Sequence, residues 1–191
     1  MVHCLVKGLY RIMKPLQFKV AQGMGFGASK IFKSVADGAT VNILIENPST
    51  SKNHVRIVGV FVAVGGKSYI NLRKNVQWTE TTNTEGVEVY NLNLGCADNS
   101  CVIAKANVSI STGSGKKMTS VVCPGATGSA PFPVVGAGSV VGESILMPPG
   151  TNLYIEIQNA SGAATDISIE VLFYEITPRE LTSKDELEFE V

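Results

Sequence analysis

Two runs of alternating apolar and polar residues stand out in the last third of the chain, Thr151–Gln158 and Asp166–Ile176. Successive side chains of a β-strand point to opposite faces, so a period of two over this length predicts two strands. The apolar residues that share one face in each run are Leu153, Ile155, Ile157, Ile167, Ile169, Val171 and Phe173. Burial of each large apolar side chain contributes roughly 1.5 to 3 kcal/mol. We therefore expect a second sheet to cover these faces.

Further runs rich in strand-forming residues precede these two and are separated by turn residues. They are Leu16–Val20, Ser29–Val35, Thr40–Asn47, Val55–Val64, Ser68–Leu72, Asn75–Glu80, Glu85–Leu94, Val102–Ser111, Met118–Val122 and Val134–Leu146. No stretch shows the period of an amphipathic helix. The pattern predicts an all-β domain, a sandwich of about eight to ten antiparallel strands.

The junctions between the runs carry more specific signals. The pair Gly65–Gly66 predicts a hairpin, and the turn at Thr112–Lys116 predicts another. Proline cannot continue a strand ladder, so the corner Met147–Thr151, which contains two prolines, indicates a chain that crosses from one sheet to the other. The run Val55–Val64 is almost entirely apolar, which is typical of a central strand.

The composition fits one domain with a neutral exterior. A chain of 191 residues buries enough surface to fold without disulfides or metal ions. The formal net charge is zero, so the overall field does not favour nucleic acid as the main partner. Only 17% of the residues are charged, against about a quarter in a typical protein. A neutral polar surface fits a protein covered by neighbouring subunits, because burial of hydroxyls costs less than burial of ions. The alternative is an ordinary β protein with Thr-rich strands and Asn-rich turns.

Charge is polarised between the two ends of the chain. Residues 1–35 contain no acid, and we expect residues 1–14 to form a basic arm ahead of a single domain at residues 15–177. The candidate arm residues, which would contact membrane headgroups or nucleic acid, are Lys7, Arg11, Lys14 and Lys19. Residues 178–191 form an acidic tail, whose candidate inter-subunit residues are Glu186, Glu188 and Glu190. The alternative is two solvated tails without partners.

Sequence motifs for catalysis or cofactor binding do not match. Gly23–Gly27 lacks the dinucleotide-binding spacing, and Gly113–Lys117 lacks two residues of a phosphate-binding loop. His3 and His54 are the two histidines, and neither lies in a recognisable catalytic motif. We therefore expect no enzymatic activity, no cofactor and no small-molecule substrate.

Two of the four cysteines, Cys96 and Cys101, form a Cys-x4-Cys pair. A zinc site would need two further ligands, and the other two cysteines stand alone in the sequence. A small disulfide across the intervening turn would constrain the unfolded chain by roughly 2 kcal/mol. Two free thiols are the alternative, and they are the expected state in a reducing cytosol.

The end of the chain combines an apolar strand, a proline corner, an alternating strand that ends at Asn159, and a last strand that closes with Phe173-Tyr-Glu175. This order resembles the end of the jelly roll in viral coat proteins, and Met147-Pro-Pro-Gly-Thr-Asn-Leu-Tyr-Ile155 carries most of the resemblance. Over residues 15–177 the chain is similar to single jelly-roll capsid proteins of icosahedral viruses of archaea or bacteria, of the polyhedral hot-spring virus type. The resemblance implies a jelly-roll sandwich with N- and C-terminal extensions.

The resemblance also implies a structural role, in which many copies self-assemble into the capsomers of a virion shell. The implied partners are copies of the chain, other capsid proteins and, through the basic arm, an internal membrane or the genome. A second hypothesis is a jelly-roll module that binds a receptor or carbohydrate, such as a spike or fibre head, although Trp78 is the sole tryptophan. A third, an enzyme of cupin type, would require clustered His and Glu ligands, which two distant histidines do not supply.

Overall fold

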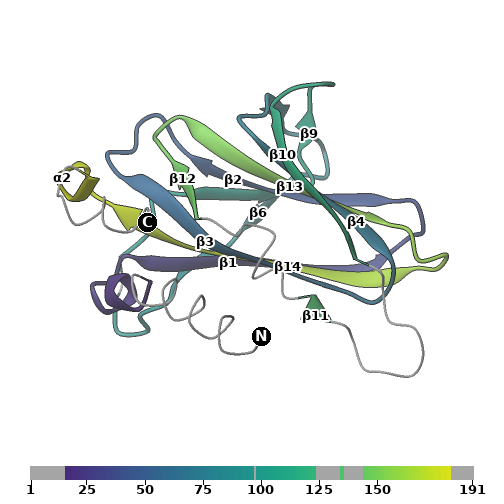
Figure 1. The fold of residues 1–191 in the computed structure, drawn as a ribbon, viewed down its shortest axis with the longest axis horizontal. Helices are drawn as coiled ribbons and strands as arrows, with labels where there is room; N and C mark the ends of the chain where they lie inside the picture. The colour runs from purple at the N-terminus through teal and green to yellow at the C-terminus, as the bar shows by residue number, and fades with distance from the viewer. Residues whose placement is uncertain (1–15, 97, 124–133, 136–143, 182–191) are drawn as a thin grey trace, which may run out of the picture.

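The computed structural model describes residues 16–96, 98–123, 134–135 and 144–181. Almost all regular structure in these residues is β-strand (Figure 1). A short helix at residues 16–21 comes first. The later elements are β1 (Gly25–Val35), β2 (Thr40–Asn47), β3 (His54–Val64), β4 (Ser68–Lys74), β5 (Trp78–Thr79), β6 (Glu85–Val87), β7 (Val89–Asn91), β8 (Ile103–Ala106), β9 (Ser109–Ile110), β10 (Lys116–Cys123), β11 (Val134–Val135), β12 (Ile145–Met147), β13 (Thr151–Asn159), β14 (Thr165–Ile176) and α2 (Pro178–Leu181).

The strands form two large sheets with one apolar core between them. In the first, which we call sheet A, the order is β11-β3-β14-β1-β7, and β12 also pairs with β3. In the second, sheet B, the order is β10-β4-β13-β2-β8-β6. A separate ribbon contains β5 and β9, and the pairs of both sheets and of the ribbon are antiparallel. The predicted all-β antiparallel sandwich is therefore confirmed.

The principal strands pair as one long hairpin that is rolled up. From the closed end outward, β4 pairs with β10, β3 with β11 and β12, β2 with β13, and β1 with β14. Rolling places β1, β3 and β14 in sheet A and β2, β4 and β13 in sheet B, so most connections cross between the sheets. This nested order is that of a jelly roll, as the resemblance to viral coat proteins implies.

The predicted apolar faces of β13 and β14 lie between the two sheets. Each of their seven apolar residues is fully buried, namely Leu153, Ile155, Ile157, Ile167, Ile169, Val171 and Phe173. The ring of Phe173 stacks on that of Phe26 in β1, with 5.9 Å between the ring centroids. Strand alternation in these two segments therefore defines much of the interior of the sandwich.

Two hairpins predicted from turn residues are not formed. Gly65–Gly66 joins β3 of sheet A to β4 of sheet B, and Thr112–Lys116 leads from β9 of the ribbon to β10 of sheet B. These predictions are wrong because a turn signal indicates a reversal of the chain but not the sheet that the next strand joins. The corner Met147–Thr151, in contrast, does carry the chain from sheet A to sheet B, as predicted.

Residues 16–21 form a helix where the sequence pattern predicted a first strand. A Schellman motif ends this helix, since the Gly23 amide donates to the Val20 carbonyl at 2.9 Å and the Met24 amide donates to the Lys19 carbonyl at 2.8 Å. Gly23 has a φ of 75°, the left-handed conformation that this motif requires. The strand prediction is wrong, because the segment is helical, with Lys19 buried, Phe18 exposed and Val20 packed against Gly25.

The ribbon of β5 and β9, with the residues next to it, forms a small second layer on the outer face of sheet B. Leu44 of β2 and Tyr154 of β13 point outward from the sheet, yet both are buried. The side chains that cover them are Val76, Trp78, Val108 and Ile110. The Asn42 amide fixes this layer, because it donates to the Val108 carbonyl at 3.1 Å and accepts from the Val108 amide at 3.0 Å. Tyr69 of β4 and Val122 of β10 stay partly exposed beside the layer.

Candidate functional site

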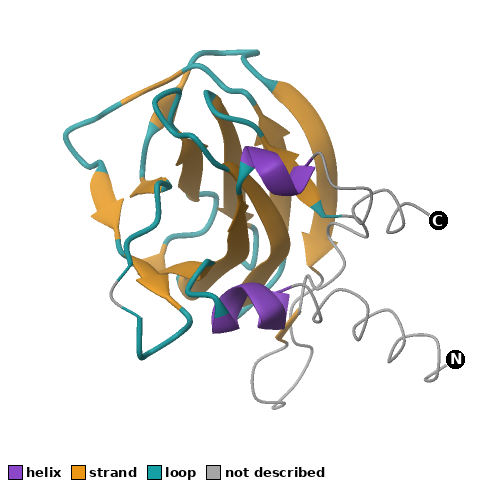
Figure 2. Cartoon of the chain, turned by 90° about the vertical axis from the view of Figure 1, so that its left-hand side faces the viewer, coloured by secondary structure: helices purple, strands orange, loops and turns teal. Residues whose placement is uncertain are grey.

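The two short helices lie at the same end of the sandwich, where they are joined by an ion pair (Figure 2). Lys19 of the first helix is buried, and its Nζ contacts Glu180 Oε1 of α2. This corrects the prediction that Lys19 belongs to an arm facing membrane or nucleic acid, because its ammonium group is used inside the domain. Local sequence could not reveal a partner that lies 161 positions away.

The other predicted arm and tail residues lie outside the described residues. They are Lys7, Arg11, Lys14, Glu186, Glu188 and Glu190. Their roles stay predictions. The helix α2 falls within residues 178–191, the predicted tail, so regular structure continues past the expected end of the domain at residue 177.

Glu180 also caps the N-terminus of α2. Its Oε2 accepts hydrogen bonds from the Thr177 backbone amide at 2.7 Å and from the Thr177 hydroxyl at 3.0 Å. With Pro178 in the first helical position, this is the arrangement of a capping box. Partial burial by itself would raise the pKa of Glu180, but the hydrogen bonds from Lys19 and Thr177 outweigh it and hold the pKa below its ordinary value.

We expect the replacement Glu180→Gln to lower stability at neutral pH but not in acid. A carboxyl group whose pKa is lower in the folded state stabilises the fold above the unfolded-state pKa, and this contribution is lost as the pH falls through the folded-state pKa. The expected loss near neutral pH is about 1 kcal/mol, the usual contribution of a helix cap with a partly exposed ion pair.

Thermal unfolding of both proteins between about pH 3 and pH 7 measures this difference in stability. The exposed Glu88→Gln variant is the control, and its melting temperature should follow that of the wild type throughout. A difference between wild type and Glu180→Gln that stays constant into acid would contradict the role of the Glu180 carboxylate.

The candidate disulfide between Cys96 and Cys101 is not formed, and both residues are free cysteines, the alternative that the sequence left open. The Cys96 thiol donates to Asp98 Oδ2 at 3.1 Å, whereas the Cys101 sulfur accepts from the Ser51 hydroxyl at 3.2 Å. Each sulfur thus has its own polar partner. Burial raises the pKa of the Cys101 thiol to about 11, although the hydrogen bond from Ser51 opposes the rise. The Cys101 thiol is therefore protonated at neutral pH.

A buried carboxylate joins two loops to the last strand. Glu175 of β14 is 5% exposed and accepts hydrogen bonds from Asn53 Nδ2 at 2.8 Å, from Ser100 Oγ at 2.7 Å and from the Cys101 amide at 2.8 Å. Asn53 precedes β3, and the other two donors precede β8. All three donors are neutral, so the carboxylate organises the loops without a salt bridge to any of them. The sequence offered no signal for this contact, because its members are distant along the chain.

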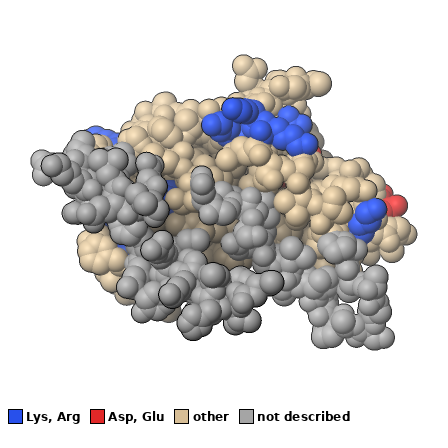
Figure 3. Space-filling model, viewed as in Figure 1, with Lys and Arg blue, Asp and Glu red and all other residues tan. Residues whose placement is uncertain are grey.

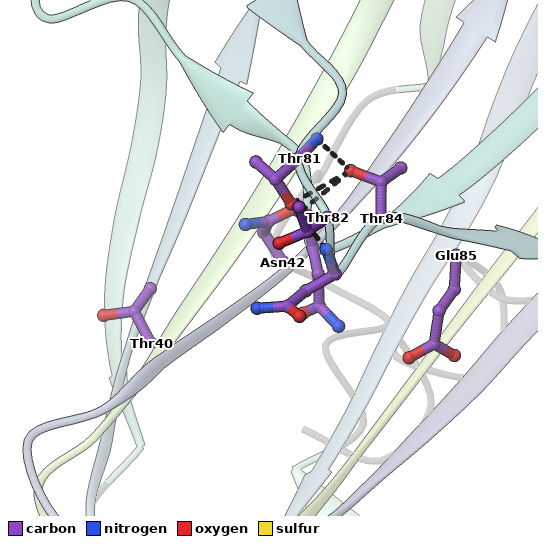
Figure 4. Close-up of a pocket in the computed structure, with 8 residues that line it drawn as sticks. Thr40, Asn42, Thr81, Thr82, Thr84 and Glu85 are labelled. Carbon is purple, nitrogen blue, oxygen red and sulfur yellow. Dashed lines mark hydrogen bonds between the residues drawn. The ribbon is translucent and has the colours of Figure 1, made fainter.

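A polar hollow of about 640 Å³ lies beside β2 (Figure 4). Its lining residues are Thr40, Asn42, Thr81, Thr82, Asn83, Thr84, Glu85 and Asn107. The hydroxyls of Thr81 and Thr84 donate to the Asn107 carbonyl at 3.1 Å and 3.2 Å, so they hold the loop together. Glu85, the one carboxylate of the lining, is ion-paired with Lys30. The hollow therefore offers mainly neutral hydroxyls and amides.

Four basic residues, which we call the basic cluster, lie where β4 ends and β10 begins, with Arg73 and Lys117 on one face of sheet B and Lys74 and Lys116 on the other. Lys74 lies opposite Lys116 and Arg73 lies opposite Lys117. In Figure 3, Lys and Arg side chains gather near the top of the view. Among the described residues, none of these four side chains forms an ion pair, and Arg73 Nε has no hydrogen-bond partner. Like charges in opposite positions destabilise an antiparallel pair, so the cluster favours an acidic partner.

The outer face of sheet A has a flat central part. The rings of Tyr90 and Phe61 lie over Gly27 and Gly59, where a Cβ atom would come within 2.6 Å of each ring. Leu172 of β14 lies between the two glycines in the strand register. The outward residues of the next two rows are Ser29, Ile31, Ala63, Ser168 and Glu170. Glu170 is the one charged residue among these positions, and its Oε1 accepts a hydrogen bond from the Tyr90 hydroxyl at 2.9 Å. Glycine thus gives this face an aromatic, mostly uncharged surface.

The described residues contain neither a candidate metal site nor a membrane-spanning helix. Across the described parts of the chain, no group of three or more His, Cys, Asp or Glu residues is placed to hold a metal ion. None of the helices in those parts has the length and apolar character needed to cross a membrane. Comparisons of the chain with models of protein families, with curated proteins and with solved structures found no match. The fold and the surfaces described above are therefore the basis for a function.

Proposed function

We propose that the protein is a structural coat subunit that self-assembles into the capsomers of an icosahedral virion shell. Its partners in this proposal are copies of itself, other capsid proteins and, through Lys7, Arg11 and Lys14, an internal membrane or the genome. The jelly roll supports the proposal, but lectins and cupins use the same architecture. A fold alone does not determine function, so the proposal depends on the surfaces of the domain.

The outer face of sheet A carries the proposal. Contacts between subunits are typically poor in charge and rich in aromatic residues. Tyr90 and Phe61 supply two rings that lie flat over glycines, and Leu172 lies between them. Ile31, which faces the same side, is 61% exposed. An aromatic and aliphatic face of this kind on a chain with only 17% charged residues fits side-by-side packing of copies.

The assembly state of the full chain tests the proposal. We expect sedimentation velocity and electron microscopy at neutral pH to show large regular particles. The variant Ile31→Asp should prevent their formation, because an unpaired carboxylate would be buried in the contact. The exposed Lys52→Asp variant is the control and should assemble normally. A wild-type chain that stays monomeric at high concentration would contradict the proposal.

The polar hollow favours a second candidate function, that of a receptor- or carbohydrate-binding module. Its neutral hydroxyls and amides are suited to polyol ligands, although several of them already form hydrogen bonds within the protein. Binding of the full chain to a glycan array, competed by free sugar and lost on Asn83→Ala, would support this alternative. A monomeric chain that binds no glycan would count against both candidates.

A further inference from the structure

The second layer leaves one part of the outer face of sheet B uncovered. The layer packs on Leu44 and Tyr154, and the Asn42 amide anchors its margin through Val108. The row of positions that begins at Asn42 continues across β13, β4 and β10 with Glu156, Asn71 and Ser120. The row beyond it holds four exposed residues of the same strands, namely Thr40, Gln158, Tyr69 and Val122. We call these two rows the open face.

The open face is polar but nearly uncharged. Asn71 Nδ2 donates to Glu156 Oε1 at 3.1 Å, and Ser120 Oγ contacts Asn71 Oδ1. The Tyr154 hydroxyl donates to the same carboxylate, at 3.4 Å from Glu156 Oε2. Glu156 is the one charged residue of the two rows, and these hydrogen bonds hold it in place. The open face therefore suits a neutral ligand rich in hydroxyl groups better than an anion, which Glu156 would repel.

Several polar groups of the open face have no hydrogen-bond partner among the described residues. They are the hydroxyls of Thr40 and Tyr69 and the Oε1 atom of Gln158, whose Nε2 donates to the Gly38 carbonyl at 3.3 Å. Tyr69 is 37% exposed, and Lys67 Nζ lies 5.4 Å from its ring centroid. An exposed ring bordered by unpaired hydroxyl and amide groups is suited to a sugar, whose C–H face stacks on the ring while its hydroxyls form hydrogen bonds.

The open face shares Thr40 and Asn42 with the polar hollow. Elsewhere in the lining, the side chains of Thr82 and Asn83 also lack a hydrogen-bond partner among the residues that the structure describes. Thr40 and Tyr69 lie two strands apart, which is about 10 Å across a sheet. A sugar ligand that reaches from the hollow to the Tyr69 ring must therefore contain more than one ring.

We propose that the open face and the polar hollow form one site for a neutral oligosaccharide, with one sugar ring stacked on Tyr69 and another in the hollow. This inference rests on the second candidate function, extends its site across sheet B and names its ligand class. It is compatible with self-assembly, because the proposed contact between copies uses the outer face of sheet A, on the other side of the sandwich.

The length of the ligand tests the extended site in the wild-type full chain. The probes for titration calorimetry are cellohexaose, maltohexaose, mannohexaose, xylohexaose and N-acetylchitohexaose, each with its disaccharide. We expect at least one hexasaccharide to bind, about tenfold or more tightly than its disaccharide, because only the longer ligand reaches from the hollow to Tyr69. Equal affinities would confine the ligand to the hollow and overturn the inference, while the second candidate function would stand. Binding of none of these probes would overturn both.

Substitutions at Tyr69 test the stacking contact with the same hexasaccharide. Tyr69→Ala should weaken binding at least about tenfold, whereas Tyr69→Trp, which keeps an aromatic face, should stay within about threefold of the wild type. Phe18→Ala is the control, because it removes an exposed ring from the first helix, outside the proposed site, and it should bind normally. Tyr69 is partly exposed, so all three variants should fold, as their melting temperatures would verify. Unchanged binding by Tyr69→Ala would overturn the inference.

Two further outcomes would assign the open face to a different partner. Tighter binding of hexagalacturonate than of every neutral hexasaccharide, lost on Arg73→Ala, would show that an acidic ligand binds beside the basic cluster. Loss of self-assembly in Tyr69→Ala, measured by sedimentation velocity, would show that the open face is a contact between copies. Either result would overturn the inference, and normal assembly of a Tyr69→Ala chain that has lost sugar binding would support it.

Discussion

Replacement of Phe173 by alanine is expected to lower the free energy of unfolding by about 3 to 5 kcal/mol. Phe173 is fully buried on the inner face of sheet A, and its ring stacks on that of Phe26. It belongs to β14, which is hydrogen-bonded to β1 on one side and to β3 on the other. Strands held on both sides cannot move far to fill the cavity that the lost ring would leave.

Urea denaturation of the variant and the wild type measures this loss. Phe18→Ala is a matched control, because it removes the same side chain from a position that is 61% exposed. The control should change stability by no more than about 0.5 kcal/mol. Equal losses at the two positions would show that Phe173 does not anchor the core.

Glu175→Ala is expected to destabilise the protein by about 3 kcal/mol, because it leaves three partly buried hydrogen-bond donors without their acceptor. The donors are Asn53 Nδ2, Ser100 Oγ and the Cys101 amide, all of which lie within 2.8 Å of the Glu175 carboxylate. The two loops that contain them should also become more mobile. Hydrogen exchange at the Cys101 amide would report that local change, and urea denaturation would report the global loss.

Glu175→Gln should cost less than half as much as Glu175→Ala. Glutamine keeps one oxygen acceptor in place, and Glu175 Oε1 alone accepts from both Ser100 and Cys101. The exposed Glu88→Ala variant is the control for loss of a carboxylate and should be close to neutral. If alanine and glutamine at position 175 had the same effect, the hydrogen bonds would not be the source of the stability.

Local alternation was sufficient to predict the strands of the core. Thr151–Gln158 and Asp166–Ile176 were predicted to within one residue of β13 and β14, and their apolar faces are those that the sandwich buries. Thr40–Asn47 was predicted with the bounds of β2. These predictions are confirmed because strand periodicity and burial are properties of consecutive residues.

Contacts between distant residues could not be predicted in this way. Lys19 was assigned to an exposed arm, but Glu180 draws it into the domain. The pairs Arg73–Lys74 and Lys116–Lys117 are visible in the sequence, yet only the antiparallel register of β4 and β10 makes them one cluster. The hydrogen-bond partners of the buried Glu175 likewise lie on loops that only the folded chain brings together.

The sequence by itself determined that this is an all-β protein, which residues face its interior and where its chain reverses. The tertiary structure decided which sheet each strand joins, since Gly65–Gly66 leads across the sandwich and not into a hairpin. It also decided that Cys96 and Cys101 are free cysteines and that the four residues of the basic cluster meet where β4 pairs with β10. The physical reason is that periodicity reports the environment of one segment, whereas pairing depends on which distant strands bury their faces together.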